Sequence, residues 1–387
     1  MSLPTPEHNC VPHVLLTLLA GEANKLSGIV KYALCLFEAL IEIGDCRYTL
    51  LTTWPADKLP DRLRRAGIIT VSDIRSEKIA YVVNAIRVAR IARGVRADVV
   101  FTPTPFGAPF GGAARVMVVH DLYRLTHPEL FRWHYKLAWR IFCPISCARS
   151  QAIICVSEAT RTEFCRHYPR QTRKAVTIHE ASSLNVTDRV GLRRPISGRY
   201  GLMVANIVPS KNVQVLFEAL DLLAKQGDYP TIFWIGRDDR GHFAEARARF
   251  PHVPGILPVG SVSPDQLAAY YAHARFYVAT SLTEGFCIPI VEAQSFGTPV
   301  ICSDIPVLRE VAHHGALFFN PLSAPALAIC ISRLWHDDLL AQALGRQAAE
   351  NAKRFSWSRS AGQTAALFRD VLKTAQERSG PTAAEFR

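Results

Sequence analysis

The sequence lacks the features that mark several large classes of protein. Its ten cysteines include no Cys-x-x-Cys pair, which argues against a zinc site of that kind. No apolar run reaches the roughly 18 residues of a membrane-spanning helix, and the short apolar run near the N-terminus follows no basic segment. Repeats, low-complexity stretches and recognised nucleic-acid motifs are also missing. We therefore expect a soluble cytoplasmic protein with buried thiols and no nucleic-acid partner.

The length of the chain limits the number of domains, and its charge indicates possible partners. A chain of 387 residues suggests two domains, and a hydrophobic fraction of 49% is that of an ordinary globular protein. The chain has 45 basic and 33 acidic residues, a formal net charge of +12. This balance predicts attraction to anions such as phosphates or an acidic membrane surface. A basic enzyme without such a partner accounts for it equally well.

Short apolar runs alternate with helical patterns along both halves of the chain. In the first helical pattern, residues 28–44, the spacing places Val30, Leu34, Phe37 and Ile41 on one face. Such alternation predicts two Rossmann-like, doubly wound parallel-sheet domains of the α/β class, facing a cleft, with ligands bound beyond the carboxyl ends of the strands. A polar, glycine- and proline-containing stretch at 185–201 separates the halves. We place the domains at residues 1–190 and 191–360.

The segment 281–304, SLTEGFCIPIVEAQSFGTPVICSD, places two carboxylates in an otherwise apolar stretch. Glu284 follows the carboxyl end of a predicted strand, and Pro289 is expected in the first turn of the next helix. Glu292 is then expected in or near that first turn, where backbone N–H groups favour negative charge. Gly285 permits a close backbone approach or a positive φ. The arrangement suits a ligand with hydroxyls and phosphates, although an ordinary acidic helix start also explains it.

Three other positions carry weaker signals. Lys211 and Asn212 precede a helix beyond the first strand of the second half, a plausible anion site, although a solvated surface lysine explains Lys211 alone. Gly28 starts a helix in the first half, as in a ligand-binding loop or a plain turn. His120 ends a strand, as a functional group or as part of a structural turn.

Residues 131–149 interleave aromatic and basic side chains. This pattern is typical of a helix lying on an anionic membrane surface. It is equally typical of a buried amphipathic helix whose cations extend to the solvent. The first alternative predicts that the protein is peripheral to the inner face of the cell membrane.

The motif at 281–311 resembles the Glu-x7-Glu signature of retaining glycosyltransferases with the GT-B fold, within the family 4 group. The resemblance covers most of the chain. It implies that Glu284 contacts the hydroxyls of the donor sugar and that Glu292 holds the ribose of the nucleotide. The backbone amides near Gly285, Phe286 and Cys287 would face the sugar and phosphate.

The same resemblance extends to the other candidate positions. Lys211 and Asn212 match the family's basic phosphate loop, in which Asn206 stands where many relatives carry arginine, and Arg237 would supply the missing cation. Gly28 matches the family's glycine loop. The pair His120–Asp121 is similar to a motif of bacterial mannosyltransferases and implies that His120 lies near the donor sugar. Residues 355–368 resemble the family's closing signature, which implies that residues 361–387 form a C-terminal helix returning to the first domain and a tail.

We therefore expect a retaining hexosyltransferase whose catalytic residues are Glu284, His120 and Lys211, acting without a metal or cofactor. The resemblance implies mannose transfer from GDP-mannose to a glycan or polyprenyl-diphosphate-linked acceptor in bacterial polysaccharide biosynthesis. A UDP-sugar donor is an open alternative. A nucleotide-sugar epimerase or a phosphorylase on the same fold is another, although no motif for a pyridoxal lysine is found. A non-catalytic nucleotide or nucleic-acid binder is the third.

Overall fold

The chain forms two compact units in the computed structural model, which describes residues 11–19, 28–72, 77–107, 109–126, 133–184, 192–253 and 255–379. The first unit comprises Met1–Val156, Arg161–Ile178 and Trp357–Arg387, and the second comprises Ser157–Thr160 and His179–Ser356. The main division thus falls at residue 179. Part of the predicted boundary segment, residues 185–191, lies outside the described residues.

The first unit is built on a parallel sheet with the strand order β3-β2-β1-β4-β5-β6-β7. Its strands are β1 (His13–Leu18), β2 (Arg47–Thr52), β3 (Gly67–Thr70), β4 (Val99–Thr102), β5 (Ala114–Val119), β6 (Ala152–Cys155) and β7 (Ala175–Thr177). Strands β1 and β6 are mainly apolar and buried at every position, as a sheet covered by helices on each side requires.

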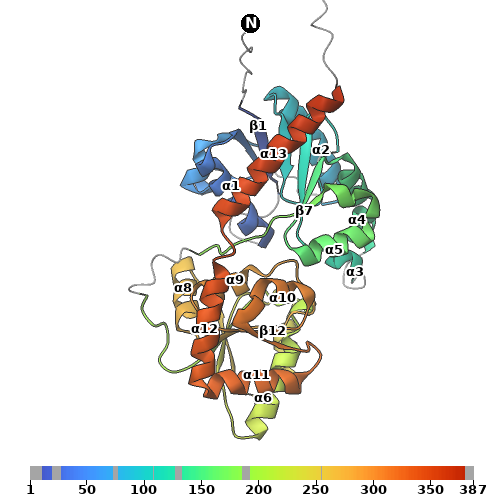
Figure 1. Ribbon diagram of the computed structural model, residues 1–387. Coiled ribbons are helices and arrows are strands. Elements are labelled where there is room, and N and C mark those ends of the chain that lie inside the picture. Colours follow the sequence, from blue (N-terminus) through green and yellow to red (C-terminus); the bar gives the residue numbers. More distant parts are fainter. Residues whose placement is uncertain are drawn as a thin grey trace, which may run out of the picture. The chain divides into compact units, whose positions relative to one another are not determined.

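Helices cover this sheet. They are α1 (Gly28–Ile43), α2 (Glu77–Gly94), α3 (Tyr123–Thr126), α4 (Trp133–Arg149), α5 (Glu158–His167) and α13 (Trp357–Ser379), with 3-10 turns at Ala56–Lys58, Asp61–Arg65 and Pro169–Lys174. The last helix, α13, packs against α1 of the same unit (Figure 1). The prediction that the C-terminal helix returns to the first domain is therefore confirmed.

The predicted inner face of α1 is only partly correct. Val30 and Phe37 are buried, but Leu34 and Ile41 are half-exposed, and the residues buried with the first pair are Tyr32, Ala33, Leu36 and Leu40. Almost every position of this helix is apolar, so periodicity alone does not select one face. Tertiary packing selects the face: α1 packs against α13, whose Phe368 meets Phe101 of β4 with ring centroids 5.5 Å apart, and Phe37 meets the same ring at 5.8 Å.

The second unit contains a parallel sheet with the order β10-β9-β8-β11-β12-β13. Its strands are β8 (Gly201–Val204), β9 (Ile232–Ile235), β10 (Ile256–Gly260), β11 (Phe276–Ala279), β12 (Val300–Ser303) and β13 (Ala316–Phe319). Its helices are α6 (Val213–Lys225), α7 (His242–Arg249), α8 (Pro264–His273), α9 (Ile288–Ser295), α10 (Pro306–Ala312), α11 (Ala324–His336) and α12 (Asp338–Ala352), with 3-10 turns at Pro209–Lys211 and His313–Gly315. The predicted α/β class with two doubly wound sheets is confirmed.

The strand order of the second unit fixes where a ligand can bind. The chain runs outward from β8 through β9 to β10, then returns to pair β11 with the other edge of β8 and continues to β13. The loops that follow β8 and β11 therefore diverge at the carboxyl ends of the strands. Such a reversal point is where ligands bind in open parallel sheets.

Gly236, directly after β9, lets the loop after β9 approach the loop after β8 closely. Its φ is 149°, and a Cβ at this position would lie 1.9 Å from the carbonyl oxygen of Ala205, which follows β8. Only glycine fits so close an approach. The same carbonyl accepts a hydrogen bond of 2.8 Å from Nε1 of Trp234. As a result, the loops carrying Asn206 and Arg237 lie side by side.

Candidate functional site

Backbone contacts join the two diverging loops of the second unit. The backbone N–H of Leu282 donates to the carbonyl of Ser210 at 2.8 Å. The buried hydroxyl of Thr280 donates to the carbonyl of Lys211 at 2.6 Å. These contacts place the end of the loop after β8 against the start of the loop after β11, so the side chains of Lys211 and Glu284 emerge next to each other.

Lys211 and Glu284 form an ion pair at the reversal point of the sheet. The Lys211 ammonium contacts Oε1 of Glu284, and the Ser281 hydroxyl donates to the same oxygen at 2.7 Å. Only 24% of the lysine side chain and 13% of the glutamate side chain are exposed. The pair is therefore largely withdrawn from water, where electrostatic interactions are stronger than at the surface. It presents a cation and a carboxylate to the same small volume.

Glu292 is held by side-chain hydroxyls from other segments of the chain. Helix α9 begins at Ile288, with Pro289 in its first turn as predicted, and Glu292, its fifth residue, lies directly after that turn, within the predicted range. Two side chains donate to its carboxylate: the Ser183 hydroxyl to Oε1 at 2.5 Å, and the Tyr271 hydroxyl to Oε2 at 3.0 Å. The residue is 1% exposed. Burial and the charge of Glu292 raise the pKa of Tyr271 well above its usual value, which keeps that hydroxyl protonated as a donor.

Cys287 shows that the three charged side chains share one neighbourhood. Burial raises the pKa of its thiol, the charges of Glu284 and Glu292 raise it further, and Lys211 opposes them. Cys287 also has a left-handed backbone, with φ of 80°, at the residue that precedes α9. A non-glycine residue in this conformation is strained and is characteristic of ligand-binding loops.

The remaining donor-site candidates of the second unit lie in adjoining loops. Oδ1 of Asn206 accepts from the backbone N–H of Arg237 at 3.2 Å, and the Arg237 guanidinium lies 3.7 Å from Asp239. Asn212 has a φ of 48° and donates through Nδ2 to the carbonyl of Pro321 at 2.8 Å. The Asn212 side chain thus fixes the start of α6, and its role in donor binding stays a prediction.

Two predicted residues belong to the first unit. His120 follows β5; its Nε2 lies 3.1 Å from the carbonyl oxygen of Pro103, and its ring meets the edge of Tyr32 with centroids 4.7 Å apart. Gly28 begins α1, and a Cβ there would have no atom of the described residues, which exclude 20–27, within 4 Å. The local structure therefore does not require glycine at this position. The roles of both residues in catalysis and donor binding stay predictions.

Sequence reasoning missed the residues that hold the two carboxylates. Ser183 and Tyr271 are 109 and 21 positions from Glu292, so no local spacing connects them to it. Ser281 was visible within the motif, three residues before Glu284, but a serine at the end of a strand carries no signal of its own. A tyrosine inside an otherwise apolar helix face, as at Tyr271 of α8, was the one available hint, because a buried hydroxyl requires a partner.

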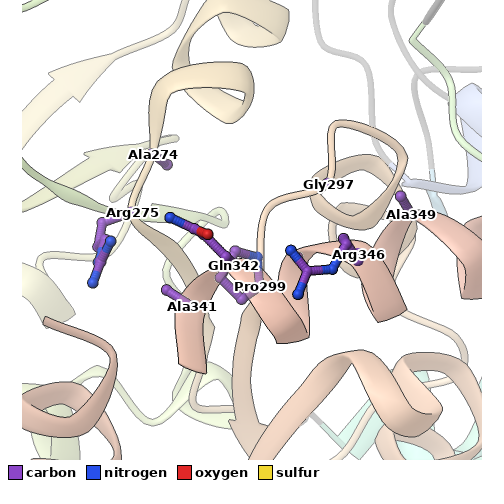
Figure 2. Close-up of a pocket in the computed structure, with 9 residues that line it drawn as sticks. Ala274, Arg275, Gly297, Pro299, Ala341, Gln342, Arg346 and Ala349 are labelled. Carbon is purple, nitrogen blue, oxygen red and sulfur yellow. The ribbon is translucent and has the colours of Figure 1, made fainter. Parts of the chain in front are cut away.

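A cavity of about 470 Å³ lies at the amino ends of the strands of the same sheet, opposite to the candidate site. Ala274 and Arg275 line it just before β11, Pro299 just before β12, and Gln342 and Arg346 line it from α12 (Figure 2). In a parallel α/β sheet, helices end near the amino ends of the strands. Here Nε of Arg275 donates to the carbonyl of Leu334, close to the end of α11. Arg275 thus faces the negative end of α11. This cavity does not contain the predicted site.

The described residues contain no group of three metal-ligating side chains and no helix long and apolar enough to cross a bilayer. The expectation that the reaction needs no metal stays a prediction.

Comparison with known proteins agrees with this geometry. Residues 26–181 match the family model described as Glycosyltransferase Family 4, and residues 188–353 match the model described as Glycosyl transferases group 1. The chain belongs to the glycosyltransferases that these two models describe, one model for each half of the chain. The glycosyltransferase is 28% identical over 282 residues to the O-antigen chain mannosyltransferase B of Escherichia coli, covering 69% of this chain and 73% of that relative.

Solved structures show the same GT-B architecture. A glycosyltransferase from Rickettsia africae superposes with a TM-score of 0.72 at 17% identity, covering 94% of this chain and 99% of the other. Anabaena HepE in complex with UDP-glucose superposes with a TM-score of 0.71 at 18% identity, again covering 94% and 99%. The glycosyltransferase therefore shares its fold with proteins whose sequences have diverged far from its own.

The geometry around Glu292 predicts the effect of removing the Tyr271 hydroxyl. Tyr271→Phe leaves a buried carboxylate with one donor fewer, so we expect the free energy of unfolding to fall by about 2 kcal/mol. Tyr200→Phe is the matched control, because the hydroxyl of this buried tyrosine donates at 3.0 Å to a neutral acceptor, the carbonyl of Tyr270. Urea unfolding should show a loss of about 1 kcal/mol for the control. Equal losses would contradict the assignment of a charged acceptor.

Proposed function

We propose that this glycosyltransferase moves mannose from GDP-mannose to a hydroxyl of a glycan or polyprenyl-diphosphate-linked oligosaccharide in bacterial polysaccharide assembly, with retention of anomeric configuration. The observation that carries the proposal is the Lys211–Glu284 pair at the reversal point of the second sheet. A cation and a carboxylate at this place suit a ligand that carries both a diphosphate and sugar hydroxyls.

The ion pair also suggests how the donor enters. The diphosphate carries more negative charge than one carboxylate, so Lys211 would exchange Glu284 for a phosphate oxygen when the donor binds. Glu284, still held by Ser281, would then accept hydrogen bonds from the sugar hydroxyls. Lys211 would stabilise the charge that develops on the departing phosphate.

Retention is proposed without a covalent sugar–enzyme intermediate. Glu284 is committed to Lys211 and Ser281, and Glu292 to Ser183 and Tyr271. Neither carboxylate is placed as a free nucleophile. The acceptor hydroxyl would therefore attack from the side on which the diphosphate leaves, and the leaving phosphate would take its proton. Catalysis would consist of positioning and charge stabilisation.

The choice of mannose is supported by the resemblance to the Escherichia coli mannosyltransferase and by the His120–Asp121 pair after β5. A UDP-sugar is the second candidate donor, and it is supported by the likeness in fold to Anabaena HepE in its complex with UDP-glucose.

Helix α4 supports a peripheral contact with an anionic membrane. One of its faces is buried through Trp139, Cys143 and Cys147. The opposite face exposes Leu137, Ile141 and Ile145, which are 49%, 46% and 43% exposed and follow one another at intervals of four. The exposed Arg140 and Arg149 lie on either side of this stripe. An apolar stripe bordered by cations matches the chemistry of an acidic lipid surface, where a polyprenyl-linked acceptor resides.

Donor binding provides the first test. GDP-mannose should raise the melting temperature of the protein, because a ligand that binds only the folded state stabilises it. Lys211→Ala and Glu292→Gln should abolish the shift and remain folded. Lys225→Ala is the matched control, since this exposed lysine pairs with Asp221 on α6. A shift with UDP-glucose in place of GDP-mannose would contradict the donor, and no shift with either would contradict the proposed function.

The stereochemical outcome is tested on the product. GDP-mannose carries an α-linked sugar, so retention predicts an α-mannoside. The one-bond coupling between C1 and H1 of the transferred residue, measured by NMR with ¹³C-labelled donor, distinguishes the two anomers. A β-linked product would show inversion and would require one of the carboxylates to act as a base.

Membrane contact is tested with vesicles. The wild type should sediment with vesicles of phosphatidylglycerol but not with vesicles of phosphatidylcholine, and the combined change Leu137→Ser, Ile141→Ser and Ile145→Ser should reduce sedimentation about tenfold or more. The matched control replaces three exposed apolar residues of the second unit, Leu322, Ile329 and Leu339, with serine. Equal binding by both triple variants would contradict the role of α4.

A further inference from the structure

The carbonyl oxygen of Gly285, in the middle of the candidate donor loop, accepts hydrogen bonds from two hydroxyls in a distant part of the sequence. Oγ of Ser157 lies 2.7 Å from it and Oγ1 of Thr160 lies 3.0 Å from it. Both residues are buried, at 0% and 6% exposure. A carbonyl oxygen has two lone pairs, so it can accept both bonds at once.

Fixing this carbonyl also fixes the next N–H group. The peptide unit is planar and trans, so the C=O of Gly285 and the N–H of Phe286 point in opposite directions. Among the residues that the structure describes, none accepts a hydrogen bond from the N–H of Phe286 or of Cys287. The Phe286 ring is anchored separately, since it is 2% exposed and meets Phe355 with centroids 5.3 Å apart. The N–H of Phe286 is therefore held in one direction, away from the two hydroxyls.

The two hydroxyls are themselves rigidly placed by the start of α5. The Glu310 carboxylate accepts from the backbone N–H of Glu158 at 2.8 Å and of Ala159 at 2.9 Å, and from His179 Nε2 at 2.7 Å. Oγ of Ser157 accepts from the N–H of Thr160 at 3.0 Å.

Glu310 stays ionised in this arrangement. Burial opposes ionisation, but the hydrogen bonds from His179 and the two amides outweigh it and lower the pKa of Glu310. The Glu310 carboxylate and Oγ of Ser157 thus accept from three backbone N–H groups at the start of α5, which have no acceptor within the helix itself.

The division of the chain supports the same assignment. Residues Ser157–Thr160 group with the second unit, which contains Gly285, whereas the rest of α5 groups with the first unit. The first turn of this helix is thus structurally part of the candidate donor-binding unit, although it lies more than 120 residues earlier in the sequence.

We propose that Ser157 and Thr160 are positioning residues, which hold the Gly285 carbonyl so that the N–H of Phe286 is aimed at an oxygen of the nucleotide-sugar donor. The inference rests on the proposed function. The hydroxyls act through the peptide and do not touch the donor. An N–H direction fixed before binding requires no reorganisation when charge develops on the leaving diphosphate, which is how preorganised donors lower a barrier.

The test compares four variants by calorimetric titration with GDP and by steady-state kinetics with GDP-mannose. Thr160→Val removes one hydroxyl at constant shape and Ser157→Ala removes the other, and each should lower GDP affinity and kcat/KM for the donor about tenfold. Thr160→Ser keeps the hydroxyl and should restore both. KM for the acceptor should not change. Thr364→Val is the matched control, because this buried hydroxyl donates to the carbonyl of Ser360 within α13 at 2.7 Å.

The control separates positioning from stability. Thr364→Val and Thr160→Val should lower the melting temperature by similar amounts, but only the latter should weaken donor binding. Wild-type donor affinity in both Thr160→Val and Ser157→Ala, with binding lost in Glu292→Gln, would overturn this inference and leave the proposed function intact. A wild-type protein that binds neither GDP nor UDP would overturn both.

Discussion

The close pairing of Lys211 with Glu284 is the constraint on which the candidate site depends. Two opposite charges largely withdrawn from water are stable only when each has its partner and the remaining oxygens are hydrogen bonded. Ser281 supplies one of those bonds, and the contact between Leu282 and Ser210 holds the two backbones in place. The pair thus preserves, in the absence of ligand, the charge pattern that a diphosphate sugar would meet.

The fold was predictable because its signal is repeated many times. Most buried strands are short apolar runs followed by a helical pattern, and the α/β class follows from that alternation. Where the signal is not periodic, prediction failed. Helix α1 is apolar around most of its circumference, so the sequence could not show that Leu36 and Leu40 face inward while Leu34 and Ile41 are half-exposed. That choice depends on tertiary packing, including the contact of α1 with α13, more than 300 residues later.

The candidate site shows the same difference between local signals and long-range contacts. The motif around Glu284 and the helix start marked by Pro289 are local, and they could be read from the sequence. The contacts of Glu292 with Ser183 and Tyr271 depend on three separate segments of the chain. The hydrogen bonds from Ser157 and Thr160 to the carbonyl of Gly285 likewise join residues that are far apart in the sequence. Local patterns thus indicate the candidate residues, and tertiary contacts decide how those residues are held.

The position of α13 has a consequence for biosynthesis. Phe368 of this helix lies against Phe101 in β4, and α13 packs along α1, so the last helix supplies part of the core of the first unit. A domain at the start of a nascent chain normally folds while the ribosome is still translating the next one. Here the second unit, which is contiguous apart from four residues, can fold as it emerges. The first unit must wait until residues 357–379 have been synthesised, and until then its uncovered apolar surface is a candidate for chaperone binding.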